Sequence, residues 1–209
     1  MKYTLKKYAS PDDRYPGNGA QFASHLLKRL EINDVEVEQA EAKTGDHYDP
    51  VAKKIRLSEG FYNGQSLTAI VVAAHETGHA IQHHSHYSLF RLRTLLAFVA
   101  AITEKTGVVL LMLMPILSLI SRSPVVGLGT TGVAIIMLGI GVVVHLITLP
   151  VEWDASFKRA LPLLEAGDYL KPEDYQPARK ILRAAAMTYV AGALASLLNM
   201  SRWLAILKR

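Results

Sequence analysis

The residues best suited to chemistry lie in the stretch 67–84, where His75, Glu76 and His79 have the spacing His-Glu-x-x-His. On a helix, residues four apart lie on the same face, so both imidazoles can reach one tetrahedral zinc ion. Glu76 is rotated by about 100° from His75, so its carboxylate can lie beside the metal without being a ligand. This arrangement suits a general base that takes a proton from water.

The neighbouring residues predict that this stretch is a helix with a buried side. Ser66 is a suitable N-cap, and Leu67, Ile70 and Val71 recur at helical spacing. Gly78 costs about 1 kcal/mol relative to alanine inside a helix, which makes sense if another backbone or a substrate comes close there. The bare motif is moderately specific, because the alternative is a chance match on an ordinary buried helix.

The composition indicates a small soluble part joined to membrane segments. Half of the 209 residues are hydrophobic and the net charge is +5. A membrane protein gathers lysine and arginine on its cytoplasmic side, so this charge does not require a nucleic-acid partner, and we expect none. There is no cysteine, so a zinc ion must be held by histidine and carboxylate. No apolar run follows Met1, so we expect no signal peptide and a cytoplasmic N-terminal part.

The segments before the motif predict a small α+β part. Residues 1–17 indicate an extended arm or loop, and 18–32 an amphipathic helix. Residues 35–38 and 54–58 alternate between apolar and polar, which predicts two strands with a turn at Asp49 and Pro50 between them. An exposed edge strand could bind an extended peptide, and a plain structural hairpin explains the pattern equally well.

Two further groups of potential ligands have plainer explanations. The segment 45–50 holds Asp and His that could form a second metal site, but in a turn such residues more often satisfy local backbone donors, which we favour. His83 lies about 12 Å along the helix from His75, too far to share an ion with it. Together with His84 and His86, it is expected to form a solvated helix end.

Beyond the motif, the sequence becomes that of a membrane protein. Residues 107–121 and 125–151 contain no Asp, Glu, Lys or Arg, and the second run is long enough to cross a bilayer. The first run is short, so its helix should begin earlier and kink at Pro115. The two runs predict a transmembrane hairpin, and a third apolar segment, 184–200, either spans as well or packs beside the active site. A large soluble helical core is the disfavoured alternative.

Positive charges orient the hairpin. Of the 23 lysine and arginine residues, 13 precede residue 107 and six lie between Lys158 and Arg183, whereas Arg122 alone lies between the two runs. The positive-inside rule therefore predicts that 1–105 and 152–183 share the cytoplasmic side.

A catalytic zinc ion needs a third protein ligand and an open position. Glu152 begins the segment that returns to the cytoplasmic side directly after the second run, so we favour it as the third ligand. Asp154 is its rival, or an acceptor that orients a zinc-bound histidine. Two ligands before the hairpin and one after it would hold the metal just above the membrane surface.

Five segments form a pattern: residues 46–50 (DHYDP), 56–59 (RLSE), 73–80 (AAHETGHA), 149–156 (LPVEWDAS) and 183–190 (RAAAMTYV). With them, most of 45–200 resembles the YugP-like neutral zinc metallopeptidases, bacterial membrane-bound proteins of the gluzincin type. The resemblance implies that His75, His79 and Glu152 are zinc ligands and that Glu76 is the catalytic base. By this resemblance we expect a short form that lacks the additional N-terminal transmembrane helix of many members, and Asp154 stands where that family has Asn.

We therefore expect a mainly helical α+β fold. Its parts are an N-terminal arm (1–17), a zincin-like catalytic part (18–105) with the motif helix at 66–84, a transmembrane hairpin (106–150), and a third-ligand helix followed by a C-terminal helix that also spans the membrane (151–209).

The expected function is that of a membrane-anchored endopeptidase with one catalytic zinc ion, multi-pass in the bacterial inner membrane, with its active site facing the cytoplasm. Glu76 takes a proton from zinc-activated water and delivers it to the leaving amine. The expected partners are the lipid bilayer and a polypeptide substrate, a membrane or membrane-proximal protein, and a membrane scaffold or a second copy is also considered. Arg183 and Tyr189 are available as a second oxyanion donor, although nothing in the sequence places them near the metal.

Two other functions stay open. A noncatalytic membrane adaptor would use the zinc as a structural ion, closed by a fourth ligand such as Asp154 or His47. A zinc hydrolase could instead act on a nonpeptide amide or a lipid.

Overall fold

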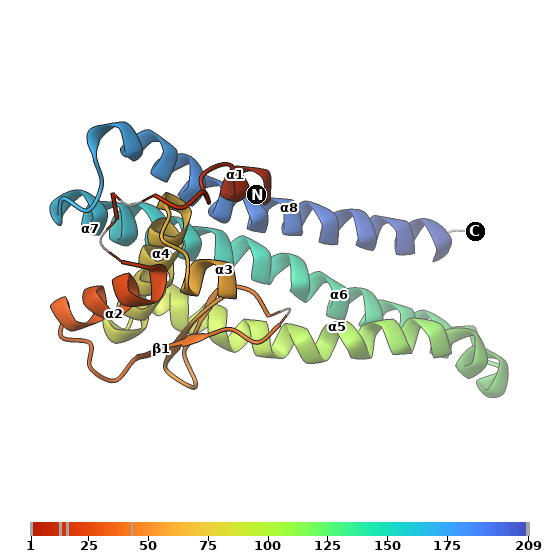
Figure 1. The fold of residues 1–209 in the computed structure, drawn as a ribbon. Coiled ribbons are helices and arrows are strands. Elements are labelled where there is room, and N and C mark those ends of the chain that lie inside the picture. The colour runs from red at the N-terminus through yellow and green to blue at the C-terminus, as the bar shows by residue number, and fades with distance from the viewer. Residues whose placement is uncertain (1, 13, 16, 43, 208–209) are drawn as a thin grey trace. The chain divides into compact units, whose positions relative to one another are not determined.

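The computed structural model describes residues 2–12, 14–15, 17–42 and 44–207 (Figure 1). The chain divides into two compact units. The first consists of the residues up to Arg91 together with Pro150–Thr188, and the second of Leu92–Leu149 with the chain from Tyr189 onward. The His-Glu-x-x-His motif lies in the first unit.

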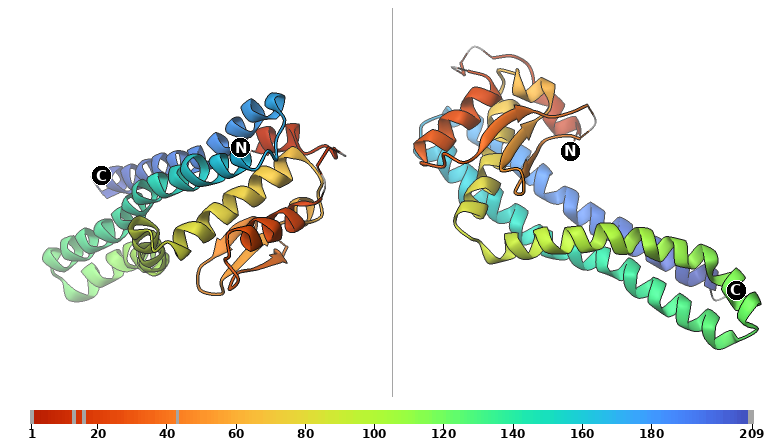
Figure 2. Two further views of the ribbon diagram at one scale, coloured as in Figure 1. Left: turned by 90° about the vertical axis from the view of Figure 1, so that its left-hand side faces the viewer. Right: turned by 90° about the horizontal axis from the view of Figure 1, so that it is seen from below.

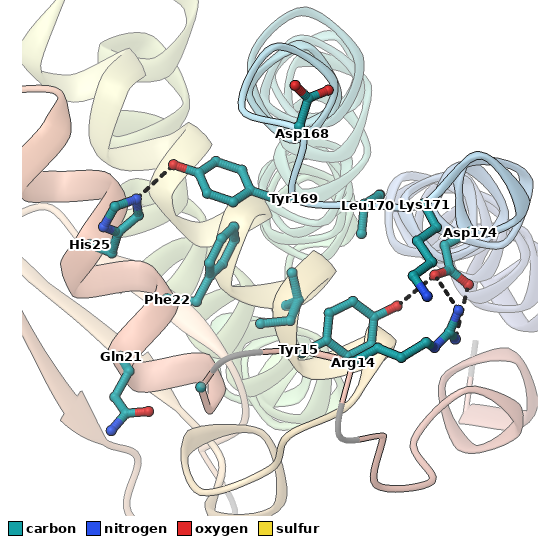
Figure 3. A pocket seen from close by; sticks show the side chains of 12 residues that line it. Arg14, Tyr15, Gln21, Phe22, His25, Asp168, Tyr169, Leu170, Lys171 and Asp174 are labelled. Atoms are coloured by element: carbon teal, nitrogen blue, oxygen red, sulfur yellow. Dashed lines mark hydrogen bonds and ion pairs between the residues drawn. The ribbon is translucent and has the colours of Figure 1, made fainter.

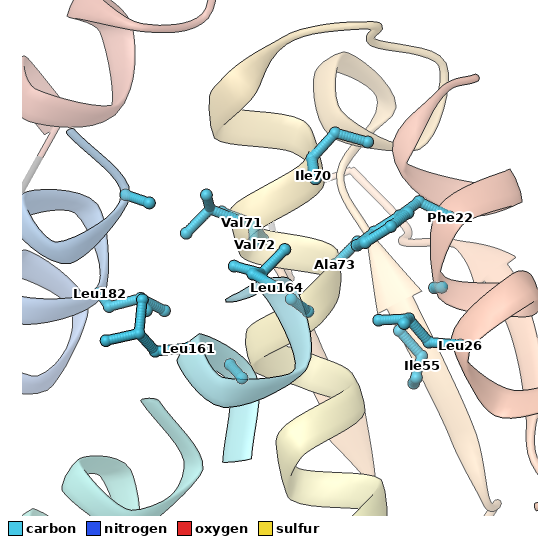
Figure 4. Close-up of a cluster of buried hydrophobic side chains, with 14 of the residues drawn as sticks. Phe22, Leu26, Ile55, Ile70, Val71, Val72, Ala73, Leu161, Leu164 and Leu182 are labelled. Atoms are coloured by element: carbon cyan, nitrogen blue, oxygen red, sulfur yellow. The ribbon is translucent and has the colours of Figure 1, made fainter. Parts of the chain in front are cut away.

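Helix α4 (Leu67–His84) is the centre of the first unit. The Ser66 side chain accepts a hydrogen bond from the Ala69 N–H, which satisfies a donor that the first turn leaves open. Most residues of α4 are buried, and its apolar side chains meet neighbours on both sides (Figure 4). The helix predicted at 66–84 and its cap are confirmed.

Helix α2 (Gly19–Arg29) packs on one side of α4. A capping box fixes its start, because Asn18 and Gln21 each accept a hydrogen bond from the other's backbone N–H. Phe22 and Leu26 are buried and lie on the side of α2 that faces α4 (Figure 4). The amphipathic helix expected in this part of the chain is therefore present, with its apolar face toward the core.

A small sheet covers the same side, with its strands in the order β1 (Glu36–Gln39), β3 (Lys54–Leu57) and β2 (His47–Asp49). β1 pairs with β3 in parallel, and β2 pairs with β3 antiparallel. The two expected strands are present, but they do not form a hairpin with each other. β2 lies between them in the sequence and makes the hairpin with β3, in a segment that the sequence indicated as a turn.

The other side of α4 is covered by η1 (Asp154–Ala160) and α7 (Leu161–Ala166), and the first part of α8 (Tyr175–Leu207) adds side chains to the same buried core. Leu164 and Leu182, both almost fully buried, point from these helices toward α4 (Figure 4). Two short helices complete the unit: α3 (Glu59–Tyr62) and η2 (Pro172–Asp174).

The N-terminal segment begins with a helix, α1 (Lys2–Lys7), where an extended arm was expected. Thr68 donates its hydroxyl to the Leu5 carbonyl at 2.9 Å and its backbone N–H to the Tyr8 carbonyl at 3.2 Å. These bonds satisfy carbonyls at the end of α1 and an N–H at the start of α4. The expectation was wrong for residues 2–7 because a helix this short depends on such distant contacts rather than on its own periodicity.

Helix α4 and η1 approach closely at Gly78. A Cβ atom at this position would lie 2.7 Å from the Ala155 carbonyl oxygen and 3.3 Å from the carbonyl carbon, so glycine alone fits without a shift of backbone. This confirms that another backbone comes close at Gly78. η1 is a π-helix, in which the Leu161 N–H bonds to the Ser156 carbonyl five residues earlier. Such wide turns are frequent at functional sites.

The second unit consists of long apolar helices. It holds most of α5 (Ser88–Ser121) and α6 (Pro124–Trp153), together with the end of α8. Within it α5 and α6 run side by side (Figures 1 and 2). α6 and α8 meet where Gly192 faces the His145 ring, since a Cβ at Gly192 would lie 2.9 Å from that ring.

Among the described residues, Gly129–Ala166 and Pro172–Leu198 are each long and apolar enough to cross a membrane. Ser88–Leu110 and Pro115–Ser121 qualify only together, as a pair bent by 56°, which agrees with the kink expected at Pro115. Of the most apolar windows in the first two stretches, only 13% and 22% are buried within the protein. Such exposure of apolar surface is typical of lipid-facing helices and disfavours a soluble helical core.

We predict that Gly78→Ala destabilises the protein, because the new methyl group meets the Ala155 backbone. The expected loss is about 1–3 kcal/mol, whereas helix propensity alone would favour alanine. Gly60→Ala is the matched control, since a Cβ at Gly60 has no atom within 4 Å. Thermal unfolding of the detergent-purified proteins checks this, and a Gly78→Ala variant as stable as the parent would contradict the close approach.

Candidate metal centre

The motif helix presents two histidines side by side. His75 and His79 lie one turn apart on α4, with their ring centroids 4.8 Å apart and their planes at 78° to each other. Both are buried, with 8% and 4% of their surface exposed. Apolar packing of α4 on both sides leaves these rings directed at the last turn of α6.

Glu152 faces the two histidines from the last turn of α6. Its Oε2 lies 3.2 Å from His75 Nε2, and its Oε1 lies 3.4 Å from His79 Nε2. One donor atom from each residue can be chosen so that all lie within 4.8 Å of one another. Tetrahedral zinc, with bonds of about 2.0–2.1 Å to nitrogen and oxygen, separates neighbouring ligand atoms by about 3.3 Å. The donor set therefore fits such an ion.

Asp154, the rival of Glu152, has a different set of partners. Its Oδ2 accepts hydrogen bonds from Gln82 Nε2 at 2.8 Å and from Arg159 Nε at 2.7 Å. Among the described residues, the group close enough for a metal contains Glu152 and not Asp154. The geometry gives Asp154 the orienting position that was the alternative to ligation.

Gln82 connects Asp154 to His79. Its Nε2 also donates to the Val151 carbonyl at 2.8 Å, so its amide oxygen is left to accept from His79 Nδ1 at 2.9 Å. A histidine that donates from Nδ1 keeps the Nε2 lone pair for a metal. Gln82 thus fixes both the tautomer and the ring orientation of His79.

Ser156 contacts the other histidine, His75. Its Oγ lies 3.1 Å from His75 Nδ1 and is fully buried in the first turns of η1. A hydroxyl oxygen that accepts from Nδ1 leaves Nε2 of His75 facing Glu152. Sequence reasoning missed both Gln82 and Ser156. Gln82, three residues after His79, could have been found from its spacing on the helix.

Glu76 is buried next to the histidines but is not a member of the metal-binding group. Burial raises the pKa of its carboxyl group, and positive charge at His75 and His79 acts in the opposite direction. A carboxylate with a raised pKa is a stronger base than an exposed one, which suits it to accept a proton.

The ligand-rich segment 45–50 does not form a second site. Asp46 Oδ1 accepts from the N–H and the hydroxyl of Ser58, Asp49 accepts from backbone N–H groups in the following turn, and His47 Nδ1 lies 3.1 Å from the Gly45 carbonyl. In the part of the chain that the structure describes, none of them belongs to a group that could hold a metal. The favoured explanation, that such residues satisfy local backbone donors, holds for Asp49, whereas Asp46 bonds Ser58 twelve residues later.

The helix end after the motif is only partly solvated. His84 and His86 are exposed, as expected. His83 is half-buried and contacts the rings of both Tyr48 and Phe90, and its Nδ1 lies 2.8 Å from the Tyr48 hydroxyl. The expectation was wrong for His83 because β2, which carries Tyr48, was not predicted.

A cavity of about 580 Å³ lies elsewhere in the first unit, between α2 and the loop that precedes α8 (Figure 3). Phe22, Ile70 and Leu170 form apolar walls, and Asp174 beside it accepts from the Tyr15 hydroxyl at 3.0 Å. None of the three grouped residues lines this cavity, so its size does not make it the chemical centre. His75, His79 and Glu152 form the group that could hold a metal ion, and they lie outside this cavity.

The two candidate oxyanion donors are not part of the group either. Arg183 is exposed and lines a cavity with α1, and Tyr189 belongs to the second unit.

We predict that Gln82→Leu weakens zinc binding, because His79 loses the acceptor that fixes its tautomer. Loss of such an orienting partner typically costs about 10- to 100-fold in metal affinity. Competition with a chelator measures the effect, and Gln39→Leu, at an exposed position, serves as the control. Equal zinc affinity in the two variants would refute the role of Gln82.

Comparison with known proteins agrees with this chemistry. Residues 1–208 match the family described as “Putative neutral zinc metallopeptidase”. The chain is 36% identical over 206 residues to a Bacillus subtilis (strain 168) protein named “Putative membrane protease YugP”, a match that covers 99% of this chain and 88% of that protein. No solved structure matches the chain. The resemblance expected from the sequence is confirmed, and the chain belongs to this neutral zinc metallopeptidase family.

Proposed function

We propose that the chain is a membrane-anchored zinc endopeptidase in which His75, His79 and Glu152 hold one catalytic ion and Glu76 is the general base. The observation that carries this proposal is the meeting of three buried donors from α4 and α6 at separations that suit one tetrahedral ion. Membership of a zinc peptidase family supports the peptide bond as the target.

The number of residues in the donor set supports a catalytic rather than a structural ion. A structural zinc site is closed by four protein ligands, whereas the group found among the described residues has three. Both residues considered as a fourth ligand have other partners: Asp154 bonds Gln82 and Arg159, and His47 bonds a nearby carbonyl. These contacts disfavour the noncatalytic adaptor.

Each residue then has a defined task. When bound, zinc supplies Lewis acidity that polarises the scissile carbonyl and makes water more acidic. The Glu76 carboxylate accepts the proton of the attacking water and later delivers it to the leaving amine. Ser156 and Gln82 hold the two histidines in the tautomer that directs Nε2 at the site.

We further propose that the active site faces the cytoplasm in a multi-pass protein of the bacterial inner membrane. The support is the concentration of lysine and arginine before residue 107 and between Lys158 and Arg183. The relative from Bacillus subtilis is named a membrane protease, and apolar helices of sufficient length are present. Substrates of such a site are membrane proteins or polypeptides presented close to the membrane.

Glu76→Gln should keep one zinc ion and lose proteolysis, because glutamine cannot take the proton. General base catalysis contributes about 10²- to 10⁴-fold, so cleavage of casein or a labelled peptide should fall by at least the lower figure. Glu59→Gln, at an exposed position on α3, is the control and should cleave as the parent does. Undiminished cleavage by Glu76→Gln would exclude Glu76 as the base.

Glu152→Ala should lose stoichiometric zinc, because one of three ligands is removed. Asp154→Asn should keep one zinc ion with weaker affinity, since it perturbs the contacts with Gln82 and Arg159 without removing a ligand. Metal analysis of both purified variants distinguishes the rival carboxylates, and the reverse pattern would assign ligation to Asp154.

A further inference from the structure

A cavity of about 360 Å³ lies between α1 and α8 in the first unit, apart from the metal-binding group. The two helices lie next to each other there (Figures 1 and 2). The α1 side of the cavity includes Tyr3, Lys7 and Tyr8, and the α8 side includes Lys180, Arg183 and Met187.

The charge of this cavity is entirely positive. Lys7, Lys180 and Arg183 line it, and no aspartate or glutamate does. Other cations of this unit, such as Arg56 and Arg159, have carboxylate partners, but no ion pair of these three is found among the described residues. Exposed cations that converge without a counter-ion attract an anion, and phosphate is the group that lysine and arginine bind best together.

The position of the cavity along α8 indicates which class of anion it binds. Arg183 and Ala184 lie three and four residues after Lys180, and Met187 lies three or four residues after them, so all four share one face of the helix. The apolar part of the candidate membrane span begins at Ala184, directly after the cations. The cavity therefore lies where α8 changes from charged to apolar, the level at which lipid head groups lie.

Exposed apolar and aromatic side chains border the same cavity. Tyr3 is 82% exposed and Met187 is 44% exposed. Tyrosine is enriched at the membrane interface because it offers an apolar ring and a polar hydroxyl. A soluble ion would leave Met187 in water, whereas an acyl chain would cover it.

We propose that this cavity binds the phosphodiester group of an anionic phospholipid. Lys180 and Arg183 pair with the phosphate from α8, and Lys7 pairs with it from α1. Met187, one turn deeper, contacts the start of an acyl chain. The lipid thereby joins α1 to α8, which gives the N-terminal helix a function at the membrane surface.

The test uses the full chain in an uncharged detergent. Phosphatidylglycerol, phosphatidylcholine and inorganic phosphate are added in separate titrations, and thermal unfolding and native mass spectrometry report binding. We expect phosphatidylglycerol to stabilise the parent more than the other two do. In Lys180→Gln/Arg183→Gln, its affinity should fall roughly 10- to 30-fold, as expected for the loss of two surface cations.

Matched variants separate a specific site from general charge attraction. Lys6→Gln/Lys28→Gln removes the same charge outside the cavity and should bind as the parent does. Lys7→Gln should bind phosphatidylglycerol more weakly than Lys6→Gln, the matched change at its neighbour on α1. Zinc retention serves as a sign of folding. If the double variant at Lys180 and Arg183 does not retain zinc, the comparison of Lys7→Gln with Lys6→Gln tests the proposal in its place.

Three results would overturn the proposal. The first is equal affinity for phosphatidylglycerol in the parent and in the cavity variants. The second is equal loss in the control pair, which would indicate unspecific attraction. The third is stabilisation by inorganic phosphate that matches that by phosphatidylglycerol, which would assign the site to soluble phosphate.

Discussion

The approach of α4 to η1 at Gly78 and Ala155 governs the geometry of the candidate metal centre. Gly78 precedes His79 directly, and Ala155 lies between the carboxylate-bearing turn and Ser156. The absence of a side chain at Gly78 lets the two backbones come close enough for Glu152 to stand about 3 Å from both imidazoles. The other contacts of the site depend on this short distance between the α4 and η1 backbones. In a close-packed interior, side chains cannot shift far enough to restore contacts across a wider separation.

A row of buried polar contacts holds the site once the helices meet. Arg159 pairs with Asp154, Asp154 accepts from Gln82, and Gln82 accepts from His79. Each bond fixes the direction of the next. The orientation of the His79 ring therefore depends on Arg159, to which it is linked through Gln82 and Asp154, and not on α4 alone. Such satisfied networks are rigid, so these donors are arranged before a ligand arrives.

Sequence patterns predicted the local features but not the features that depend on contacts with distant segments. The motif helix, its Ser66 cap and the close backbone at Gly78 follow from helical spacing and from the cost of glycine, and all are found. β2 and α1 were missed because short elements take their stability from partners elsewhere in the chain. Ser156 could not be found, because its contact with His75 exists only through the packing of η1 on α4.

The hydrogen bond from Gln82 to Val151 joins positions 69 residues apart, and most of α5 and α6 is synthesised between them. With the proposed ligand set, a nascent chain that extends only through α4 contains His75 and His79 but not Glu152. The third ligand is added only after α5 and almost all of α6 have been synthesised. The order of synthesis therefore keeps the proposed ligand set incomplete until both apolar helices have been made.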